Sequence, residues 1–372
     1  MKTSKILNYI LVVLLIIVTG FLGYFIYKDY KKEIIQMTNI TKTEKEVTIT
    51  DKGIAEAVDK LYDATVIVEM EERGELVSWG SGFVYKTDGD VAYVITNYHV
   101  TDGYNNCTIE FANGEKTDGT VIGGDEYTDV SIVKISSEKV MSVASIGESA
   151  QTKLGDTIFA VGSPVTLNLK FTVTRGILSG KDRLISMSSK NYNSGIYGRS
   201  SGSSESWYIN LLQVDASINS GNSGGPLANA NGEVIGITNS KLSSSSIENI
   251  GFAIPIEDVL NIATQVIEHG KVERPFLGAS LSNVDSAIYQ GIIPQDTNVE
   301  GTVVVEIVDG SSLSKAGFKS GDIITKLGDY STPNYMYLKY YLYRFKVGEK
   351  ITVTFIRDGK EQTKEITLEK KS

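Results

Sequence analysis

The chain opens on a long apolar stretch. Residues 6–27 carry no charged side chain and are rich in Ile, Leu, Val and Phe. A bilayer core about 30 Å thick needs about 20 such residues, so the pattern predicts a transmembrane helix. A cleaved signal peptide is the alternative, but its apolar region is shorter and ends in a small-residue exit, which this stretch lacks. We therefore predict an uncleaved anchor at 6–27 after a short tail at 1–5.

The charges around this stretch leave its orientation open. Two lysines and the amino terminus precede it and three lysines follow it closely, so the positive-inside rule is nearly balanced. Residues 28–50 mix Lys, Glu and Thr with little apolar periodicity. This composition predicts a solvated linker.

Beyond residue 50 the pattern becomes that of a β-rich unit. The apolar spacing from Ile54 to Leu61 predicts a helix, and an amphipathic stretch from Ile256 to His269 predicts a second one. Between them, short β-branched and aromatic runs alternate with turn residues, which is typical of an all-β barrel or sandwich. The clearest runs are Thr65–Val68, Gly82–Tyr85, Ala92–Ile95, Cys107–Phe111, Val130–Val133, Thr157–Val161 and Val234–Ile237.

Two serine-rich segments interrupt the strands, and a second unit follows them. Residues 186–206 hold nine serines and three glycines, so we expect a surface loop there and another at 243–246. Beyond Arg274 the chain is again mostly strands, with a helix expected from Asn334 to Phe345. The predicted compact units are 51–272 and 273–372.

Composition excludes several classes of protein. The formal net charge of -9 argues against a nucleic-acid binder, which would present a basic face. A single cysteine, Cys107, rules out an internal disulfide and is expected to be a small buried strand residue. With one cysteine and two histidines the chain cannot fill a structural zinc site of the usual kind. We expect no metal and no cofactor.

The most informative string is Gly221-Asn222-Ser223-Gly224-Gly225-Pro226-Leu227. A serine hydroxyl becomes a nucleophile when a base takes its proton, and flanking glycines leave room for a substrate carbonyl. The N–H groups of Gly221 and Ser223 could then stabilise the oxyanion. A plain Gly/Asn turn between strands is the alternative interpretation.

A base and an orienting acid must come from elsewhere in the chain. His269 precedes a glycine at a predicted helix end, where a capping role is favoured. His99 follows a predicted strand and is the better base. Asp129 opens another predicted strand and ranks above Asp102 and Asp125 as the acid. The order His, Asp, Ser is one of the known orders of a catalytic triad.

These segments resemble those of the HtrA (high-temperature-requirement A) serine proteases. The matching blocks are Thr96-Asn97-Tyr98-His99-Val100, Asp129, Gly221-Asn222-Ser223-Gly224-Gly225-Pro226, Gly251-Phe252-Ala253-Ile254-Pro255, Pro275-Phe276-Leu277-Gly278 and Ala316–Ile324. The resemblance covers about residues 52–370. It implies a mainly β fold, with a chymotrypsin-like double β-barrel at 51–272 and a PDZ domain at 273–372.

The resemblance also implies an activity and a location. It implies a serine endopeptidase of protein quality control or the stress response, anchored in the cell membrane by one span. Its catalytic part would lie outside the cytoplasm and its first residues inside. His99, Asp129 and Ser223 would be catalytic, and Gly221, Asn222 and Ser223 would form the oxyanion hole. Unfolded polypeptides with free C-termini are the expected partners, and a trimer is the expected assembly.

Two further sites follow from the same resemblance. The specificity pocket is expected to involve Ser217, Ile218 and Ile237, with no buried anion, which favours cleavage after Val, Ala or Ile. The PDZ site would bind a peptide C-terminus through Phe276, Leu277, Gly278, Ala279 and Leu281.

Residue Asn222 stands where zymogen-type relatives carry an aspartate. Asparagine cannot pair with a freed amino terminus, so activation is expected to come from loop rearrangement. Residues 186–206 lie where the family has regulatory loops, and a loop without a role is the alternative.

Two other functions stay open: a membrane-tethered chaperone or peptide-binding protein, and a signalling protease dedicated to one membrane substrate.

Overall fold

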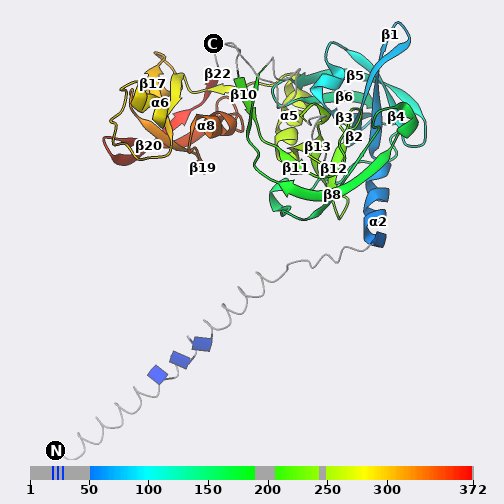
Figure 1. Ribbon diagram of the computed structural model, residues 1–372, viewed down its shortest axis with the longest axis horizontal. Helices are drawn as coiled ribbons and strands as arrows, with labels where there is room; N and C mark the ends of the chain where they lie inside the picture. Colours follow the sequence, from blue (N-terminus) through cyan, green and yellow to red (C-terminus); the bar gives the residue numbers. More distant parts are fainter. Residues whose placement is uncertain are drawn as a thin grey trace, which may run out of the picture. The chain divides into compact units, whose positions relative to one another are not determined.

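A computed structural model of the chain describes residues 19–20, 23–24, 27–28, 51–188, 206–242 and 249–370 (Figure 1). The chain separates into two units, 1–49 and 50–372, and the fold below is that of the second. Most of the predicted anchor and the whole stretch 29–50 lie outside the described residues. Among the residues that are described, no helix is both long and apolar enough to cross a membrane.

The first barrel closes in the order β1-β2-β3-β6-β5-β4. Its strands are β1 (Thr65–Glu72), β2 (Glu75–Asp88), β3 (Val91–Thr96), β4 (Asn106–Phe111), β5 (Lys116–Asp125) and β6 (Val130–Ser136). All neighbours pair antiparallel. Cys107 lies in its core, where burial raises the pKa of the thiol to about 12. This confirms its prediction as a small buried residue.

The second barrel closes in the order β11-β14-β13-β12-β7-β8. Its strands are β7 (Thr157–Gly162), β8 (Thr172–Gly180), β11 (Leu212–Val214), β12 (Pro226–Asn229), β13 (Val234–Thr238) and β14 (Gly251–Pro255). One apolar cluster joins the two barrels, because Phe83 and Ile132 of the first share it with Phe159 and Ile237 of the second.

Two helices cover this core. Helix α2 (Asp51–Tyr62) contributes Leu61, and α5 (Ile256–His269) contributes Val259 and its apolar neighbours. Helix α5 packs on β5 and β6 of the first barrel and on β13 and β14 of the second (Figure 1). Gly270 ends α5 in the left-handed region, with φ +71°, and His269 lies in the last turn of the helix. The capping role of the His269 side chain stays a prediction.

The segment 186–206 is partly strand, which corrects the prediction of a loop over its whole length. Strand β9 (Ile185–Ser188) pairs antiparallel with β10 (Ser206–Ile209). Cross-strand pairing of Trp207 with Met187 buries both side chains. Residues 189–205 and 243–248 lie outside the described residues.

The C-terminal part is a sheet with three helices. The sheet has the order β16-β17-β18-β20-β21, with β19 paired to β18, and β15 and β22 form a separate two-stranded sheet. The elements are β15 (Pro275–Phe276), β16 (Ala279–Asn283), α6 (Val284–Tyr289), β17 (Thr302–Ile307), α7 (Ser312–Lys315), β18 (Ile323–Leu327), β19 (Tyr330–Ser331), α8 (Tyr335–Leu342), β20 (Lys350–Arg357), β21 (Lys360–Thr367) and β22 (Glu369–Lys370). Helix α8 confirms the helix expected near Asn334. Strand β16 lies at an edge of the sheet.

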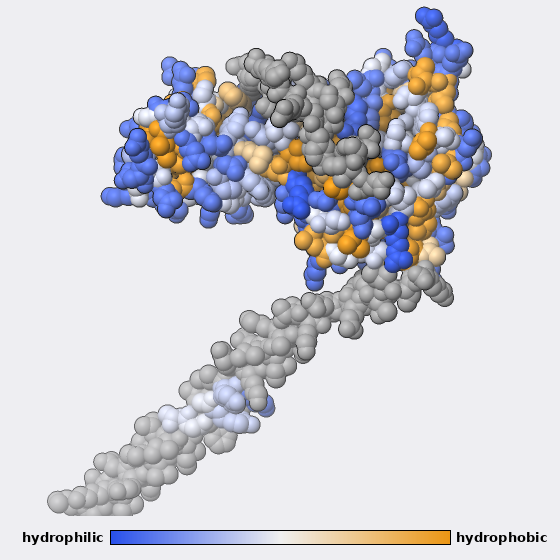
Figure 2. Space-filling view, in the orientation of Figure 1, coloured by the Kyte–Doolittle hydropathy of each residue, from blue (hydrophilic) through white to orange (hydrophobic). Residues whose placement is uncertain are grey.

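The visible face of the second unit is largely hydrophilic, with apolar residues in scattered patches (Figure 2). Val165 and Leu169, which are 59% and 50% exposed, belong to the loop after β7. That loop, residues 163–171, contains the short 3-10 helix η2 (Leu167–Leu169) and matters for the site described next.

Candidate active site

His99 and Asp129 form a two-point contact. His99 lies in the short helix α3 (Tyr98–Thr101), directly after β3, and Asp129 directly precedes β6. The ring Nδ1 of His99 lies 2.7 Å from Oδ2 of Asp129, and the main-chain N–H of His99 donates to Oδ1 at 2.9 Å. Asp129 is only 1% exposed. The carboxylate therefore fixes both the ring and the backbone of the histidine.

A further residue, which no motif in the sequence indicates, contacts the same carboxylate. Asn239, just after β13, donates from Nδ2 to Oδ2 of Asp129 at 2.6 Å. The side chain of Asn97 donates to the main-chain oxygen of Asp129 at 2.8 Å. Asn97 meets Asp129 because β3 and β6 are paired in the first barrel. Asn239 does not stand out in the sequence, because it follows β13 of the second barrel and only the packing of the two barrels brings it to Asp129.

The serine turn packs against the segment that leads to His99. A Cβ added at Gly224, where φ is +84°, would lie 2.3 Å from Oγ1 of Thr96 and 2.9 Å from N of Asn97. Only glycine tolerates both this conformation and this approach. The main-chain N–H of Ser81, in β2, donates to the carbonyl of Ser223 at 2.8 Å. The nucleophile turn is thus held at the junction of the barrels.

The hydroxyl of Ser223 is bound to Ser240 in this structure. Ser240 opens the 3-10 helix η3 (Ser240–Leu242). Its Oγ lies 2.5 Å from Oγ of Ser223, and its N–H donates to the same atom at 3.1 Å. Within the described residues no hydrogen bond joins Ser223 to His99. The histidine and aspartate are therefore paired, whereas the serine holds a different partner.

Two main-chain N–H groups of the serine turn, those of Gly221 and Ser223, can bind an anion. The N–H of Val165 donates to the carbonyl of Ser220 at 2.7 Å, and Oγ of Ser81 donates to the carbonyl of Gly221 at 2.7 Å. These bonds fix the orientation of the peptide units around Gly221. Within the described part of the chain, the N–H groups of Gly221 and Ser223 have no acceptor. An oxyanion hole needs such a pair of preorganised donors.

Asn222 does not belong to this pair of donors. Its N–H donates to the carbonyl of Asn219 at 3.0 Å, which corrects its place in the predicted oxyanion hole. Its side-chain Nδ2 donates to the carbonyl of Ser217 at 3.3 Å. Its Oδ1 is buried and meets no donor in the described residues.

The loop 163–171 is fastened at both ends to the first barrel. The N–H of Ser163 donates to Oγ of Ser81 at 3.1 Å, and Trp79 Nε1 donates to the carbonyl of Ser163 at 3.3 Å. At the other end Nζ of Lys170 lies 2.8 and 2.7 Å from the two carboxylate oxygens of Glu110. This loop also carries Val165, so its anchoring supports the geometry of the oxyanion donors.

The carboxylate that receives Lys170 belongs to a buried ion cluster. Glu69 and Glu110 are 2% and 7% exposed, and Lys116 lies 2.5 Å from Oε2 of Glu69. Burial opposes ionisation of Glu110, but hydrogen bonds from Lys170 and Lys116 outweigh it and lower the pKa of its carboxyl. Buried carboxylates are retained in charged form only with such partners.

The predicted specificity residues fall into two groups. Ser217 is exposed, whereas Ile218 and Ile237 are buried in separate apolar clusters. Their part in selecting a substrate remains a prediction.

The C-terminal unit holds a groove between the edge strand β16 and helix α8. This groove of about 250 Å³ is lined by Phe276, Leu277, Ala279 and Leu281 from the predicted set, and by Tyr335, Leu338, Leu342 and Tyr343 from α8 and its end. Gly278 lies between them at φ +79°, where a Cβ would meet Ser311 at 2.0 Å. Within the described chain, the N–H groups of Leu277 and Gly278 have no acceptor.

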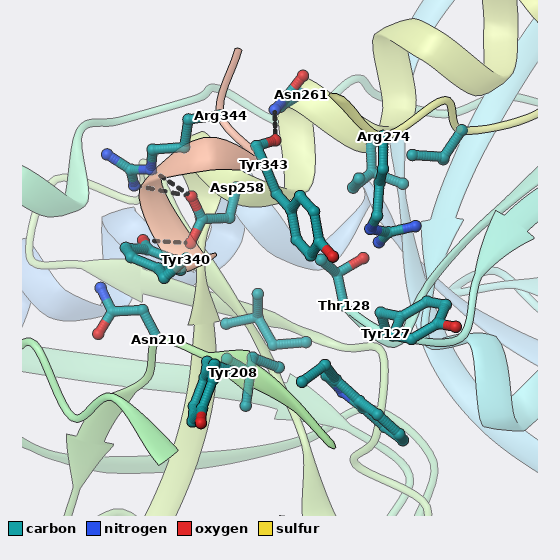
Figure 3. Close-up of a pocket in the computed structure, with 15 residues that line it drawn as sticks. Tyr127, Thr128, Tyr208, Asn210, Asp258, Asn261, Arg274, Tyr340, Tyr343 and Arg344 are labelled. Atoms are coloured by element: carbon teal, nitrogen blue, oxygen red, sulfur yellow. Dashed lines mark hydrogen bonds and ion pairs between the residues drawn. The ribbon is translucent and has the colours of Figure 1, made fainter. Parts of the chain in front are cut away.

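A polar seam joins α5 to α8 and is drawn in Figure 3. Asp258 of α5 accepts from the hydroxyl of Tyr340 at 2.8 Å and from Nη2 of Arg344 at 2.7 Å. Burial raises the pKa of Asp258, and Arg344 opposes that shift. Nδ2 of Asn261 donates to the carbonyl of Tyr343 at 3.4 Å. The groove helix is thus hydrogen-bonded to the barrels, which the sequence patterns did not predict.

Both parts of the chain that carry these sites match known protein families, and curated proteins are similar to the chain. Residues 80–237 match the trypsin-like peptidase domain, and residues 275–368 match the PDZ domain. The serine protease Do-like HtrA of Lactococcus lactis subsp. lactis is 39% identical over 307 residues, covering 80% of this chain and 72% of that protein. The serine protease Do-like HtrB of Bacillus subtilis is 40% identical over 299 residues, covering 78% of this chain and 62% of that protein.

Solved structures give the same picture. The serine endoprotease from Yersinia pestis is 28% identical with a TM-score of 0.60, covering 86% of this chain and 98% of that one. The HtrA-type protease AlgW with tripeptide is 26% identical with a TM-score of 0.65, covering 86% of this chain and 97% of that one.

Proposed function

Because this chain belongs to the HtrA family of serine endopeptidases, we propose that it degrades unfolded or damaged proteins outside the cytoplasm. The observation that carries the proposal is the pairing of His99 with Asp129 at 2.7 Å beside a serine turn with two free N–H groups. This set supplies a base, an orienting acid, a nucleophile and oxyanion donors, which are the parts that peptide hydrolysis requires.

In the proposed reaction Ser223 first exchanges its hydrogen bond with Ser240 for one with Nε2 of His99. The serine Oγ then attacks the peptide carbonyl while Nε2 takes its proton, and the N–H groups of Gly221 and Ser223 bind the resulting oxyanion. Collapse breaks the C–N bond, and Nε2 returns the proton to the leaving amine. Water repeats the sequence on the acyl-enzyme and releases the acid.

Unfolded casein tests the activity and the specificity together. We expect the full chain to cleave casein after Val, Ala or Ile, because the predicted pocket residues Ser217, Ile218 and Ile237 offer a basic side chain no counter-charge. Mass spectrometry of the products gives the residue before each cut, and a tightly folded protein of similar size is the control. Cuts mostly after Lys and Arg would contradict the pocket. Intact casein would favour either a tethered chaperone or peptide-binding protein, or a signalling protease dedicated to one membrane substrate.

We also propose that the groove between β16 and α8 binds a peptide C-terminus. Strand β16 is an edge strand, which supports strand addition, and the free N–H groups of Leu277 and Gly278 suit a carboxylate. Leu281 and Leu338 give the groove apolar walls for the last side chains of the peptide.

A pair of peptides tests the groove. A fluorescent peptide ending in an apolar residue with a free carboxylate is expected to bind the Ser223→Ala chain about tenfold more tightly than its C-terminal amide, because charged hydrogen bonds are lost in the amide. Fluorescence anisotropy measures both affinities. Equal affinities would argue against carboxylate recognition at Leu277 and Gly278.

The proposal includes a membrane anchor and an oligomeric state. The uncharged stretch 6–27 supports a single membrane anchor, with residues 1–5 in the cytoplasm and the catalytic unit outside. A trimer is proposed from the family alone. Retention of the full chain in membranes after alkaline extraction tests the anchor, and sedimentation of detergent-solubilised protein tests the assembly. A dedicated signalling protease would cleave one membrane protein and leave casein intact.

A further inference from the structure

Arg274 lies where the barrel unit passes into the C-terminal unit, directly before β15. Its Nη2 lies 2.5 Å from Oδ2 of Asp125. Its guanidinium also stacks over the ring of Tyr127 at 4.5 Å and over that of Tyr343 at 5.1 Å from the ring centres. Figure 3 shows Arg274 beside Tyr127 and Thr128. One side chain therefore contacts the turn between β5 and β6 and the end of α8.

Asp125 uses the same carboxylate to close the turn that follows it. It is the last residue of β5 and is 5% exposed. Its Oδ2 accepts from the N–H of Thr128 at 2.9 Å and from Oγ1 of Thr128 at 2.5 Å. A buried carboxylate is stabilised by a cationic partner, and among the described residues Arg274 is the cation paired with Asp125. The turn therefore depends on the arginine.

The next residue of that turn is Asp129, which faces His99. Asp129 has φ +56°, a left-handed conformation that costs a residue with a side chain about 1–2 kcal/mol. Such strain persists only where the surroundings hold it. On one side the carbonyl of Asp129 is held by Asn97 and Tyr98. On the other side the turn is held by Asp125 with Arg274.

We propose that Arg274 is a positioning residue for the triad: through Asp125 and Thr128 it holds Asp129 in the geometry that orients His99. The inference rests on the roles proposed above for His99, Asp129 and Ser223. Because Arg274 also stacks on Tyr343, the geometry of the triad depends on a residue at the junction of the two domains.

The test is the kinetics of Arg274→Gln in the full chain. We expect kcat for a peptide substrate to fall between about tenfold and about 100-fold, because small displacements of catalytic groups reduce rates by such factors. We expect KM to stay within about twofold of the wild-type value. Arg274→Lys, which keeps the charge, should recover part of the loss. Activity is compared per folded molecule, with the folded fraction taken from circular dichroism.

A matched arginine and a double variant separate this role from a structural one. Arg344→Gln removes an arginine from the neighbouring pair with Asp258 and should leave kcat within about twofold. Asp125→Asn should reproduce the loss, and adding it to Arg274→Gln should lower kcat no further, because both act through one contact. If Arg274→Gln does not fold, Asp125→Asn tests the same contact.

The outcomes distinguish the inference from the proposed function. Unchanged kcat in Arg274→Gln, an equal loss in Arg344→Gln, or losses that multiply in the double variant would each overturn the positioning role while the wild-type chain still cleaves. Lack of cleavage by the wild-type chain would overturn the triad and, with it, the role of Arg274.

Discussion

Replacing Ser223 by alanine is expected to lower peptide hydrolysis by about 10⁶-fold, the effect of removing a serine nucleophile that works as a unit with its base. The N–H groups of Gly221 and Ser223, which have no acceptor in the described part of the chain, lie on the same turn as this hydroxyl. The measurement is the hydrolysis rate of a peptide substrate by the purified chain.

The variant should remain folded. Among the described residues the hydroxyl of Ser223 bonds only to Ser240. Its loss is therefore expected to remove about 1 kcal/mol of stability at most, which a thermal melt can verify. Ser137→Ala is the matched control, since that hydroxyl bonds the carbonyl of Gly89 and has no place in the site; its rate should equal that of the wild type. A Ser223→Ala chain that keeps a few per cent of wild-type activity would refute the assignment of the nucleophile.

Asp129→Asn is expected to lower kcat by about 10⁴-fold with little change in KM, because the amide imposes the wrong histidine tautomer. Both carboxylate oxygens of Asp129 accept hydrogen bonds: Oδ1 from the N–H of His99, and Oδ2 from Nδ1 of His99 and from Asn239. An asparagine has one oxygen, so in either orientation its NH₂ group faces a donor. A buried donor is then left without an acceptor, so the variant is also expected to be less stable than the wild type.

Steady-state kinetics and a thermal melt measure the two effects of Asp129→Asn separately. Asp102→Asn is the control, because Asp102 lies three residues from His99 but is exposed and does not contact its ring. That control should stay within about twofold of the wild type. A loss of only tenfold in Asp129→Asn would show that Asp129 is not the orienting acid.

Much of the fold could be read from local patterns. The alternation of apolar and polar residues located the strands around Val94, Ile109 and Val133, and the helical spacing located α5. Each pattern lies within one strand or helix, because one face of that element packs against the core and its apolar residues recur at the period of the element. The ends of residues 186–206 were missed, because serine-rich sequence gives no apolar alternation, and the pairing of β9 with β10 depends on Trp207 and Met187.

In the candidate site, too, some features follow from the sequence and others only from the tertiary structure. The chemistry of His99, Asp129 and Ser223 is a matter of residue type, and two histidines in the chain left little choice of base. The direction of each N–H is a matter of backbone geometry. The resemblance implies a place for Asn222 in the oxyanion hole, but its N–H donates to the carbonyl of Asn219 instead.

The sequence by itself therefore determined which residues can react and which segments become strands, because residue type and periodicity are carried by neighbouring positions. Tertiary structure alone decided which partner holds each reactive group: Asn239 on Asp129, Ser240 on Ser223, and Arg274 on Asp125. These contacts join residues 17, 110 and 149 positions apart in the chain. The packing of the two barrels and of the segment after α5 brings them within hydrogen-bond distance, and no local pattern encodes that distance.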